Sequence, residues 1–341
     1  MDSCQQPLDA ATCLSQVEAT YVRVIQAAAR AHGACEQYVD EVHAAYTTRL
    51  DTIAQSTQAE LGGIFRWSTA PWRDPIWETF APETAAPIPA TVRLGRFFPL
   101  ESPRTLDLPA LAPLIGHGHL FFLGEDPAPL RHMLSLTLLR LLVSFPPGML
   151  RLTLVDPVTA GSALSAFLHL PPMLRGPDVI IRPEAMEQQL RELEDQIASL
   201  SQTRLANLYP TIEAYNASPD ALTIPYRILA LADLPSGLDE RSAGRLLTIA
   251  RNGPRVGIYI VASINASIAP PRNFALDTLT SLGTVVHLVD PDQLTWNDPL
   301  LANKVIHADP MPPVAQMNRW LMLVGRAASA SMCCFAHNRC R

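Results

Sequence analysis

The residues His119-Leu-Phe-Phe-Leu-Gly-Glu-Asp-Pro127 join a short apolar run to the start of a helix. Asp126 is a favoured N-cap residue, and Pro127 fits the first helical position, where an N–H has no helical partner to lose. Apolar residues continue at helical spacing to Pro146-Pro147-Gly148, where the helix must end. A second apolar run covers residues 150–155. This order predicts a β-α-β unit with two parallel strands.

Three more apolar runs of strand length follow at residues 228–232, 258–262 and 285–289, and a charged helix with one apolar stripe is expected at about 184–205. Apolar strands that alternate with helices are typical of a mostly parallel sheet flanked by helices. The sequence therefore predicts an α/β fold. Because ligands of such sheets bind outside the carboxyl ends of the strands, the candidate site residues there are Gly124, Asp156, Asp233 and Ser263.

The N-terminal part of the chain has a different pattern. From Leu14 to Val42, apolar or small residues recur at three-four spacing, which places them on one stripe of a helix, as in the seam of a coiled coil. The pattern loosens at His32-Gly33 and resumes at Tyr46. One bent helix and a helical hairpin both fit this pattern.

These changes of pattern divide the chain into four expected parts. They are an N-terminal helical segment at residues 1–80, a linker rich in Pro, Ala and Thr at 81–91, an α/β domain at 92–310, and a C-terminal helix with an irregular tail at 311–341. The order predicts that the α/β domain is preceded by a helical hairpin or coiled-coil segment.

Three tryptophans, Trp67, Trp72 and Trp77, lie close together among Pro and Thr residues after Gly62-Gly63. Their large rings either fill the core of this chain or contact a partner protein. The sequence leaves both roles open.

The composition limits the possible functions. The chain has 341 residues, and its 26 basic and 32 acidic side chains give a formal net charge of −6, so it lacks the cationic field of a polybasic membrane-binding or histone-like protein. Lys304 is the single lysine, and all other basic residues are Arg. No signal-peptide pattern and no run of roughly 18 apolar residues is present, so we expect a cytoplasmic protein that does not bind membranes.

The six cysteines lie near the two ends of the chain, which favours reduced thiols over a disulfide framework. Cys333, Cys334, His337 and Cys340 contain the atom types of a zinc site. Structural zinc sites, however, usually pair two Cys-rich units in a folded knuckle, and this tail has no second unit. We therefore expect no metal site.

Five stretches occur in the order of one known family, namely His119–Gly124, Leu154–Val158, Tyr215-Asn216, Pro225–Asp233 and Ile249–Ser263. On these stretches the chain resembles the motor domain of the FtsK/SpoIIIE-type DNA translocases, a RecA-like P-loop nucleoside triphosphatase family. The resemblance covers residues 118–265 and implies a RecA-like sheet. For an intact family member it also implies ATP and Mg²⁺ as cofactors and DNA as a partner.

The phosphate loop of this family has the pattern Gly-x4-Gly-Lys-Ser/Thr, in which backbone N–H groups surround the phosphates, Lys neutralises them and the hydroxyl holds Mg²⁺. Gly124 matches the first glycine. Pro129 then stands at the second glycine, Leu130 at the lysine and Arg131 at the hydroxyl residue. Pro129 has no N–H and Leu130 no charge, so we expect this remnant phosphate loop not to bind nucleotide. ATP and Mg²⁺ remain implied by the resemblance alone.

The other family site positions are also incomplete. Asp233 ends its strand where the family has a pair of acids, and either alignment leaves one acid absent; its alternative role is a turn cap. Ser263 stands at the position of the family's phosphate-sensing strand, and Ile264 replaces the glutamine that follows it. Arg251 matches a family arginine and is a candidate arginine finger toward a neighbouring subunit, or it lies on a solvated face.

These losses predict a degenerate, non-catalytic pseudo-ATPase that acts as a structural module of a translocase-type assembly. Its expected partners are an intact motor domain or oligomeric neighbours, contacted through the helical arm and Trp67, Trp72 and Trp77, and weak DNA binding is expected at this net charge. Two alternatives stay open. One is an active ATP-dependent DNA translocase that uses Arg131 in place of the lysine, and the other is a truncated product without independent function.

Overall fold

The structure is a computed structural model that describes residues 10–64, 66–98, 108–176, 178–206, 208–219, 222–272, 274–296 and 305–337. The chain divides into two compact units, residues 1–55 and residues 56–341. No helix in these described ranges is both long enough and apolar enough to cross a membrane.

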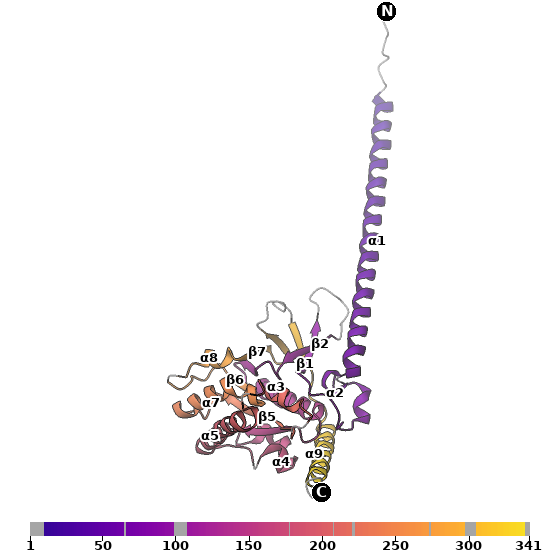
Figure 1. Ribbon diagram of the computed structural model, residues 1–341. Coiled ribbons are helices and arrows are strands. Elements are labelled where there is room, and N and C mark those ends of the chain that lie inside the picture. Colours follow the sequence, from indigo (N-terminus) through magenta and orange to yellow (C-terminus); the bar gives the residue numbers. More distant parts are fainter. Residues whose placement is uncertain are drawn as a thin grey trace, which may run out of the picture. The chain divides into compact units, whose positions relative to one another are not determined.

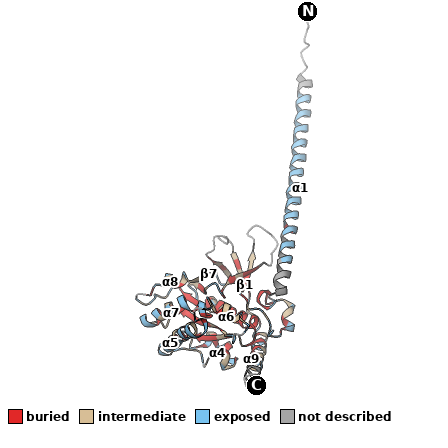
Figure 2. Ribbon diagram, in the orientation of Figure 1, coloured by how far each residue is buried: buried red, intermediate tan, exposed pale blue. Residues whose placement is uncertain are grey.

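The described part of the first unit consists of residues 10–55 of α1 (Ala10–Ile64), which is one uninterrupted helix (Figure 1). Of the two arrangements that the sequence left open, the structure has the single helix, and the hairpin is excluded. The helix continues through Gly33. A side chain added there would meet no atom within 4 Å, so no close contact requires glycine at this position. Nearly all described side chains of α1 are exposed (Figure 2).

The second unit is built on a nine-stranded sheet with the order β2-β1-β9-β8-β7-β3-β6-β5-β4. Its strands are β1 (Thr91–Phe98), β2 (Leu108–Pro113), β3 (His119–Gly124), β4 (Leu150–Val155), β5 (Tyr226–Leu234), β6 (Ile258–Asn265), β7 (Gly283–Asp290), β8 (Gln293–Trp296) and β9 (Val305–Ala308). The five neighbouring strands β7, β3, β6, β5 and β4 are parallel and correspond to the five predicted apolar runs. The predicted α/β fold with a mostly parallel sheet is confirmed.

Helices cover both faces of the parallel strands. The step from β3 to β4 crosses the sheet in one direction, whereas the steps from β4 to β5, β5 to β6 and β6 to β7 cross it in the other. Because such crossovers are right-handed, the helix of the first step lies on one face and the helices of the other steps lie on the opposite face. They are α3 (Pro127–Ser144) on the first face and α5 (Pro183–Leu200), α7 (Glu240–Asn252) and α8 (Leu276–Thr280) on the second.

Shorter helical segments and one C-terminal helix complete the second unit. The segments are α2 (Arg66–Thr69), η1 (Pro75–Thr79), η2 (Ser162–His169), α4 (Pro172–Arg175), η3 (Ser201–Leu205), α6 (Ile212–Asn216) and η4 (Pro254–Val256). The C-terminal helix α9 (Val314–His337) packs against α3. Lys304, Cys340 and the side chains of Cys333, Cys334 and His337 lie outside the described residues.

Four antiparallel strands that the apolar runs did not predict extend the sheet beyond β7. β1 pairs with β2 and β9, and β8 joins β9 to β7. The register of β1 against β2 shifts between Arg93 and Gly95. A Cβ atom at Gly95 would overlap the carbonyl oxygen of His307 in β9, so only glycine permits this approach of the two backbones.

The three tryptophans lie in the core of the second unit. Trp67 and Trp72 are each 5% exposed, and Trp77 is fully buried. The ring of Trp320 in α9 stacks on Trp72, with centroids 5.3 Å apart, and lies 4.8 Å from the ring of Trp77. The expectation that these tryptophans contact a partner protein is therefore wrong, because their rings are covered by the chain's own aromatic core.

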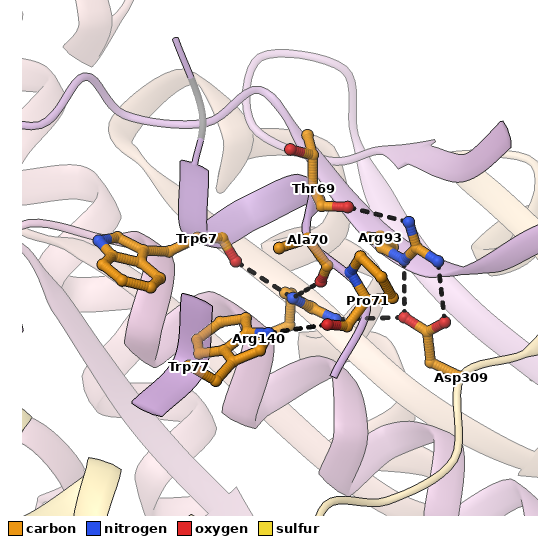
Figure 3. A network of polar contacts seen from close by, with 8 residues as sticks. All are labelled: Trp67, Thr69, Ala70, Pro71, Trp77, Arg93, Arg140 and Asp309. Atoms are coloured by element: carbon orange, nitrogen blue, oxygen red, sulfur yellow. Dashed lines mark hydrogen bonds and ion pairs between the residues drawn. The ribbon is translucent and has the colours of Figure 1, made fainter. Parts of the chain in front are cut away.

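A buried aspartate with two arginines joins this aromatic core to the sheet (Figure 3). Arg93 of β1 makes a bidentate contact with Asp309, with Nε 2.7 Å from Oδ2 and Nη2 3.1 Å from Oδ1. Arg140 of α3 donates from Nη2 to the same Oδ2 at 3.2 Å. All three residues are less than 5% exposed. One carboxylate therefore balances two buried guanidinium groups.

Other donors of these arginines bind backbone carbonyls around α2, whereas the buried Nε of Arg140 has no hydrogen-bond partner among the described residues. Arg140 Nη1 donates to the carbonyl oxygens of Trp67 and Ala70, at 3.1 and 2.7 Å. Its guanidinium carbon also lies 3.6 Å from the centroid of the Trp72 ring, a cation–π distance. The pKa of Arg140 is lowered to about 9, mainly by burial; Asp309 opposes this shift and the nearby Arg93 adds to it. The network thus fixes α2, α3, β1 and the segment after β9 to one another.

His119, the first residue of β3, is fully buried and has a structural role. Its Nδ1 accepts a hydrogen bond from the N–H of Ile260 at 3.0 Å, so Nε2 carries the proton and donates to the carbonyl of Ala250 at 2.8 Å. Burial lowers the pKa of His119 to about 4, while the Ala250 contact opposes this shift. The imidazole is therefore neutral at pH 7.

Candidate functional site

The polar candidates meet at the carboxyl edge of the parallel strands. Gly124 ends β3 beside Asn265, which ends β6, so Ser263 lies two residues before this edge. In the neighbouring strands, Asp233 is the penultimate residue of β5, and Asp156 follows β4. The sheet order β3-β6-β5-β4 therefore brings the four predicted positions to one edge.

The turn after β3 leads directly into α3. The side chain of Asp126 accepts a hydrogen bond from the N–H of Ala128 at 3.0 Å, as expected of an N-cap. Pro127 and Pro129 have no N–H. Of the first three residues of α3, only Ala128 therefore has a backbone donor, and the helix's own cap already binds it.

Leu130, at the position of the family lysine, is a core residue. It is fully buried, and its Cδ2 atom lies 3.5 Å from the place that a Cβ atom of Gly124 would occupy. The side chain therefore packs against the end of β3 and belongs to the core.

Arg131, at the position of the family hydroxyl, forms an ion pair with Asp233. Its Nε lies 2.7 Å from Asp233 Oδ2, and the two side chains are 22% and 1% exposed. The residues are 102 positions apart in the chain. The basic residue at the candidate phosphate-loop position is thus bound to the candidate acid of β5.

The backbone at Asp233 has an unusual conformation. Its φ angle is +58°, in the left-handed region that Asp tolerates better than most residues. The ladder between β5 and β6 is irregular here, and the N–H of Asp233 donates to Ser263 Oγ at 2.8 Å. Ser263 is therefore a structural partner of the strand end. The turn that follows is closed by the backbone carbonyl of Asp233, which accepts a hydrogen bond from the N–H of Ser236 at 2.8 Å, whereas Oδ2 of the side chain binds Arg131.

The carboxyl of Asp233 is only partly compensated. Its Oδ1 atom is buried and has no hydrogen-bond partner among the described residues. Burial raises the pKa of Asp233, Arg131 opposes the shift, and the nearby Asp156 adds to it. Asp156 itself is fully used as a turn cap, since its carboxylate accepts hydrogen bonds from the backbone and hydroxyl of Thr159 and from the N–H of Ala163.

Comparison with family models and with curated proteins finds no match. Among solved structures, the chain is similar to EssC (ATPases 2 and 3) from Geobacillus thermodenitrificans. The alignment covers 73% of this chain and 51% of the EssC chain, with a TM-score of 0.52 and 17% sequence identity. EccC (ATPases 2 and 3) from Thermomonospora curvata, in complex with a signal sequence peptide, matches 70% and 47%, with a TM-score of 0.56 and 15% identity. The pCW3 conjugation coupling protein TcpA matches 71% and 70%, with a TM-score of 0.50 and 15% identity.

The chain has the fold of the FtsK/SpoIIIE-like P-loop ATPases. It spans about half the length of the EssC and EccC chains that it matches. At this level of identity the likeness describes the fold, and the chemistry has to be judged from the residues of this chain.

The residues at the FtsK/SpoIIIE-like phosphate-loop position do not fit a bound triphosphate. A triphosphate needs several free backbone donors, a cation for its oxygens and a hydroxyl for Mg²⁺. The first turn of α3 instead has two prolines and one capped N–H, and the exposed residue Glu125 directly precedes the N-cap Asp126. The nearest cation, Arg131, already binds Asp233.

Arg251 lies away from this edge. It is an exposed residue in the last turn of α7, and this helix ends before β6 begins. The C-terminal end of α7 is therefore at the amino edge of the parallel strands, opposite to Gly124 and Asp233. Arg251 is not part of the site within its own chain, and a contribution to the site of a neighbouring subunit stays a prediction.

Sequence reasoning found the positions of the remnant site but missed its main contact. The sequence predicts that Arg131 replaces the family hydroxyl and that Asp233 is the one acid left of a pair, and nothing in the sequence links the two residues. The signal that was present is the charge at position 131, the single basic residue in the first turn and a half of α3.

Replacing Arg131 by methionine is expected to lower the free energy of unfolding at pH 7 by about 1–3 kcal/mol, because the buried carboxylate of Asp233 loses a charged hydrogen bond. The raised pKa of Asp233 rises further in this variant, so the deficit shrinks as the pH falls and the carboxyl becomes neutral. Urea unfolding from pH 7 to pH 4 measures both effects. The matched control is Arg191→Met on the exposed surface of α5, and an equal deficit in both variants would contradict the prediction.

Proposed function

We propose that the chain is a non-catalytic module with an FtsK/SpoIIIE-like ATPase fold, in which the α/β domain of residues 92–310 keeps the scaffold of a motor without its triphosphate site. The Arg131–Asp233 ion pair carries this proposal. A working site needs a cation directed to the phosphates and an acid directed to Mg²⁺ or water. Here the two charges neutralise each other, which supports a site that neither binds nor hydrolyses a nucleoside triphosphate.

The role that follows is architectural. The EssC and EccC structures each contain more than one ATPase domain, named ATPases 2 and 3. An inert domain of this fold can serve as a fixed neighbour for an intact motor domain, either in one assembly or in an oligomer. We propose such a protein partner, contacted through the helical arm, and a cytoplasmic location. The negative net charge of the chain argues against tight DNA binding.

A second candidate function rests on Arg131 itself. This side chain is 22% exposed, so a nucleotide that displaced it from Asp233 would gain a cation and free an acid at once. In that case the chain is an active ATP-dependent translocase with an arginine in place of the lysine. The ion pair would then be a resting contact.

Nucleotide turnover separates the two functions. The inert module is expected to release no phosphate from radiolabelled ATP in a Mg²⁺-dependent way, and to retain no fluorescent ATP analogue at micromolar concentration. Measuring phosphate release with and without DNA tests whether DNA stimulates ATP turnover, as expected of a translocase. Mg²⁺-dependent turnover that disappears in Arg131→Ala and persists in the surface control Arg191→Ala would overturn the proposal in favour of the second candidate.

A further inference from the structure

Helix α1 has an apolar stripe that stays exposed in the structure (Figure 2). We call it the α1 seam, and its residues are Leu14, Val17, Tyr21, Val24, Ala28, Ala31, Cys35, Tyr38, Val42 and Ala45. They repeat without a break at the alternating spacing of positions a and d of a heptad. The large members are 50–67% exposed. A helix of 55 residues that leaves such a stripe in water is the signature of a missing helical partner.

The sizes of the seam residues fit a second copy of the same helix in antiparallel orientation. In an antiparallel pair, position a of one helix lies level with position d of the other. If the pair is centred on Gly33, Tyr21 faces Ala45, and Tyr38 faces Ala28. Each large ring then meets a methyl group, so the Tyr–Ala layers have similar volumes to each other and to the layer of Val24 and Val42, as good core packing requires.

A parallel pair in register packs the same residues badly. Tyr21 would face its own copy, as would Tyr38, while Ala28 and Ala31 would form two thin layers between them. Thick layers force strain and thin layers leave voids. The order of sizes along the seam therefore favours the antiparallel pair.

The charges of α1 favour the same orientation. Residues 23–30 contain Arg23 and Arg30 and no acid, and residues 36–41 contain Glu36, Asp40 and Glu41 and no base. Centred on Gly33, the antiparallel pair places residues 23–30 of one copy along residues 36–43 of the other, so that stretches of opposite charge lie side by side, mostly on the sides of the two helices away from the seam. A parallel pair would place each charged stretch beside itself.

We infer that α1 is a self-association helix, whose seam binds the seam of a second copy of this chain in antiparallel orientation with its centre at Gly33. Gly33 lies on the side of the helix away from the seam, where an added side chain meets no atom, so it does not disturb the contact. The inference deepens the proposed architectural role, since it names the partner of the helical arm. It is tested separately, because self-association does not depend on whether ATP is hydrolysed.

Sedimentation equilibrium of the full chain over a range of concentrations tests the association. We expect a reversible dimer whose dissociation constant rises about a hundredfold in Val24→Glu, because this residue is buried against Val42 twice in the symmetric pair. The matched control is Gln26→Glu on the outer side of α1, which is expected to change the constant by no more than about twofold. A chain that stays monomeric, or equal effects of both variants, would overturn the inference.

Disulfide cross-linking tests the orientation. In a chain whose other five native cysteines are replaced by Ser, Cys35 faces Ala31 of the second copy. Oxidation of Ala31→Cys in this background is expected to give a covalent dimer with a 31–35 linkage, identified by peptide mass. The control Ala29→Cys, on the outer side, is expected to stay unlinked at position 29. A rapid 35–35 linkage in the background chain would establish a parallel pair and overturn the inference.

Discussion

Asp309→Ala is expected to lower the free energy of unfolding by about 3–5 kcal/mol, the largest loss that we predict for a single substitution in this protein. Removing this carboxylate leaves the guanidinium groups of Arg93 and Arg140 buried, close together and without a counter-charge. Burial already lowers the pKa of Arg140 with Asp309 present, and the variant removes the group that opposes that shift. Urea unfolding at pH 7, followed by tryptophan fluorescence, measures the loss.

An exposed ion pair provides the control for Asp309. Asp178 lies 3.5 Å from Arg175, and its side chain is 85% exposed, so Asp178→Ala is expected to cost less than about 1 kcal/mol. Replacing Arg93 and Arg140 by Met together with Asp309→Leu is expected to recover part of the lost stability, since no buried charge remains. If Asp309→Ala and Asp178→Ala lower the free energy of unfolding by the same amount, the buried network of Arg93, Arg140 and Asp309 does not stabilise the fold as predicted.

Acidification is expected to remove about 3 kcal/mol of stability through His119 alone. Because the pKa of His119 falls from 6.5 to about 4 in the folded protein, the unfolded chain binds a proton between these values and the folded chain does not. The stabilising effect is therefore complete above pH 6.5, is lost as the pH falls toward 4, and stops changing below that. Unfolding free energies between pH 7 and pH 4 measure this slope.

His119→Gln isolates this effect from other titrating groups. The variant is expected to be less stable at pH 7, because the contacts with Ala250 and Ile260 are impaired, but its stability falls less steeply with acidification. Asp233 acts in the opposite sense, since a raised carboxyl pKa favours the folded state at low pH. The control His117→Gln changes an exposed neighbour and is expected to keep the wild-type slope. An unchanged slope in His119→Gln would refute the assignment.

The parallel half of the sheet could be predicted because its strands are buried on both faces. Residues 150–155 form β4 with the predicted boundaries, and the helix after β3 begins at Pro127 behind the predicted cap at Asp126. Each of these elements is determined by a local pattern of apolar residues, caps and prolines. Local patterns also identified the edge at which the candidate site lies.

The antiparallel half could not be predicted in this way. The buried charged residue Arg93 lies within β1. It breaks the alternation of apolar and polar residues that is expected of a strand with one solvent-exposed face. The charge is tolerated because Asp309, 216 residues away, lies opposite to it. The contact of Arg131 with Asp233 was invisible for the same reason, because it depends on the way the whole sheet is assembled. The left-handed backbone of Asp233 likewise follows from the irregular ladder with β6.

The pairing of β1 with β9 has a consequence for biosynthesis. At roughly 5–20 residues per second, a ribosome needs on the order of 10–40 seconds to add Asp309 after Arg93 has been translated. During that interval the nascent chain carries an unneutralised guanidinium and an open strand edge, which are targets for chaperones and for aggregation. Translation of residues 305–309 therefore determines when β1 can pair with β9 and Arg93 with Asp309, although these residues belong to none of the strands that carry the candidate site.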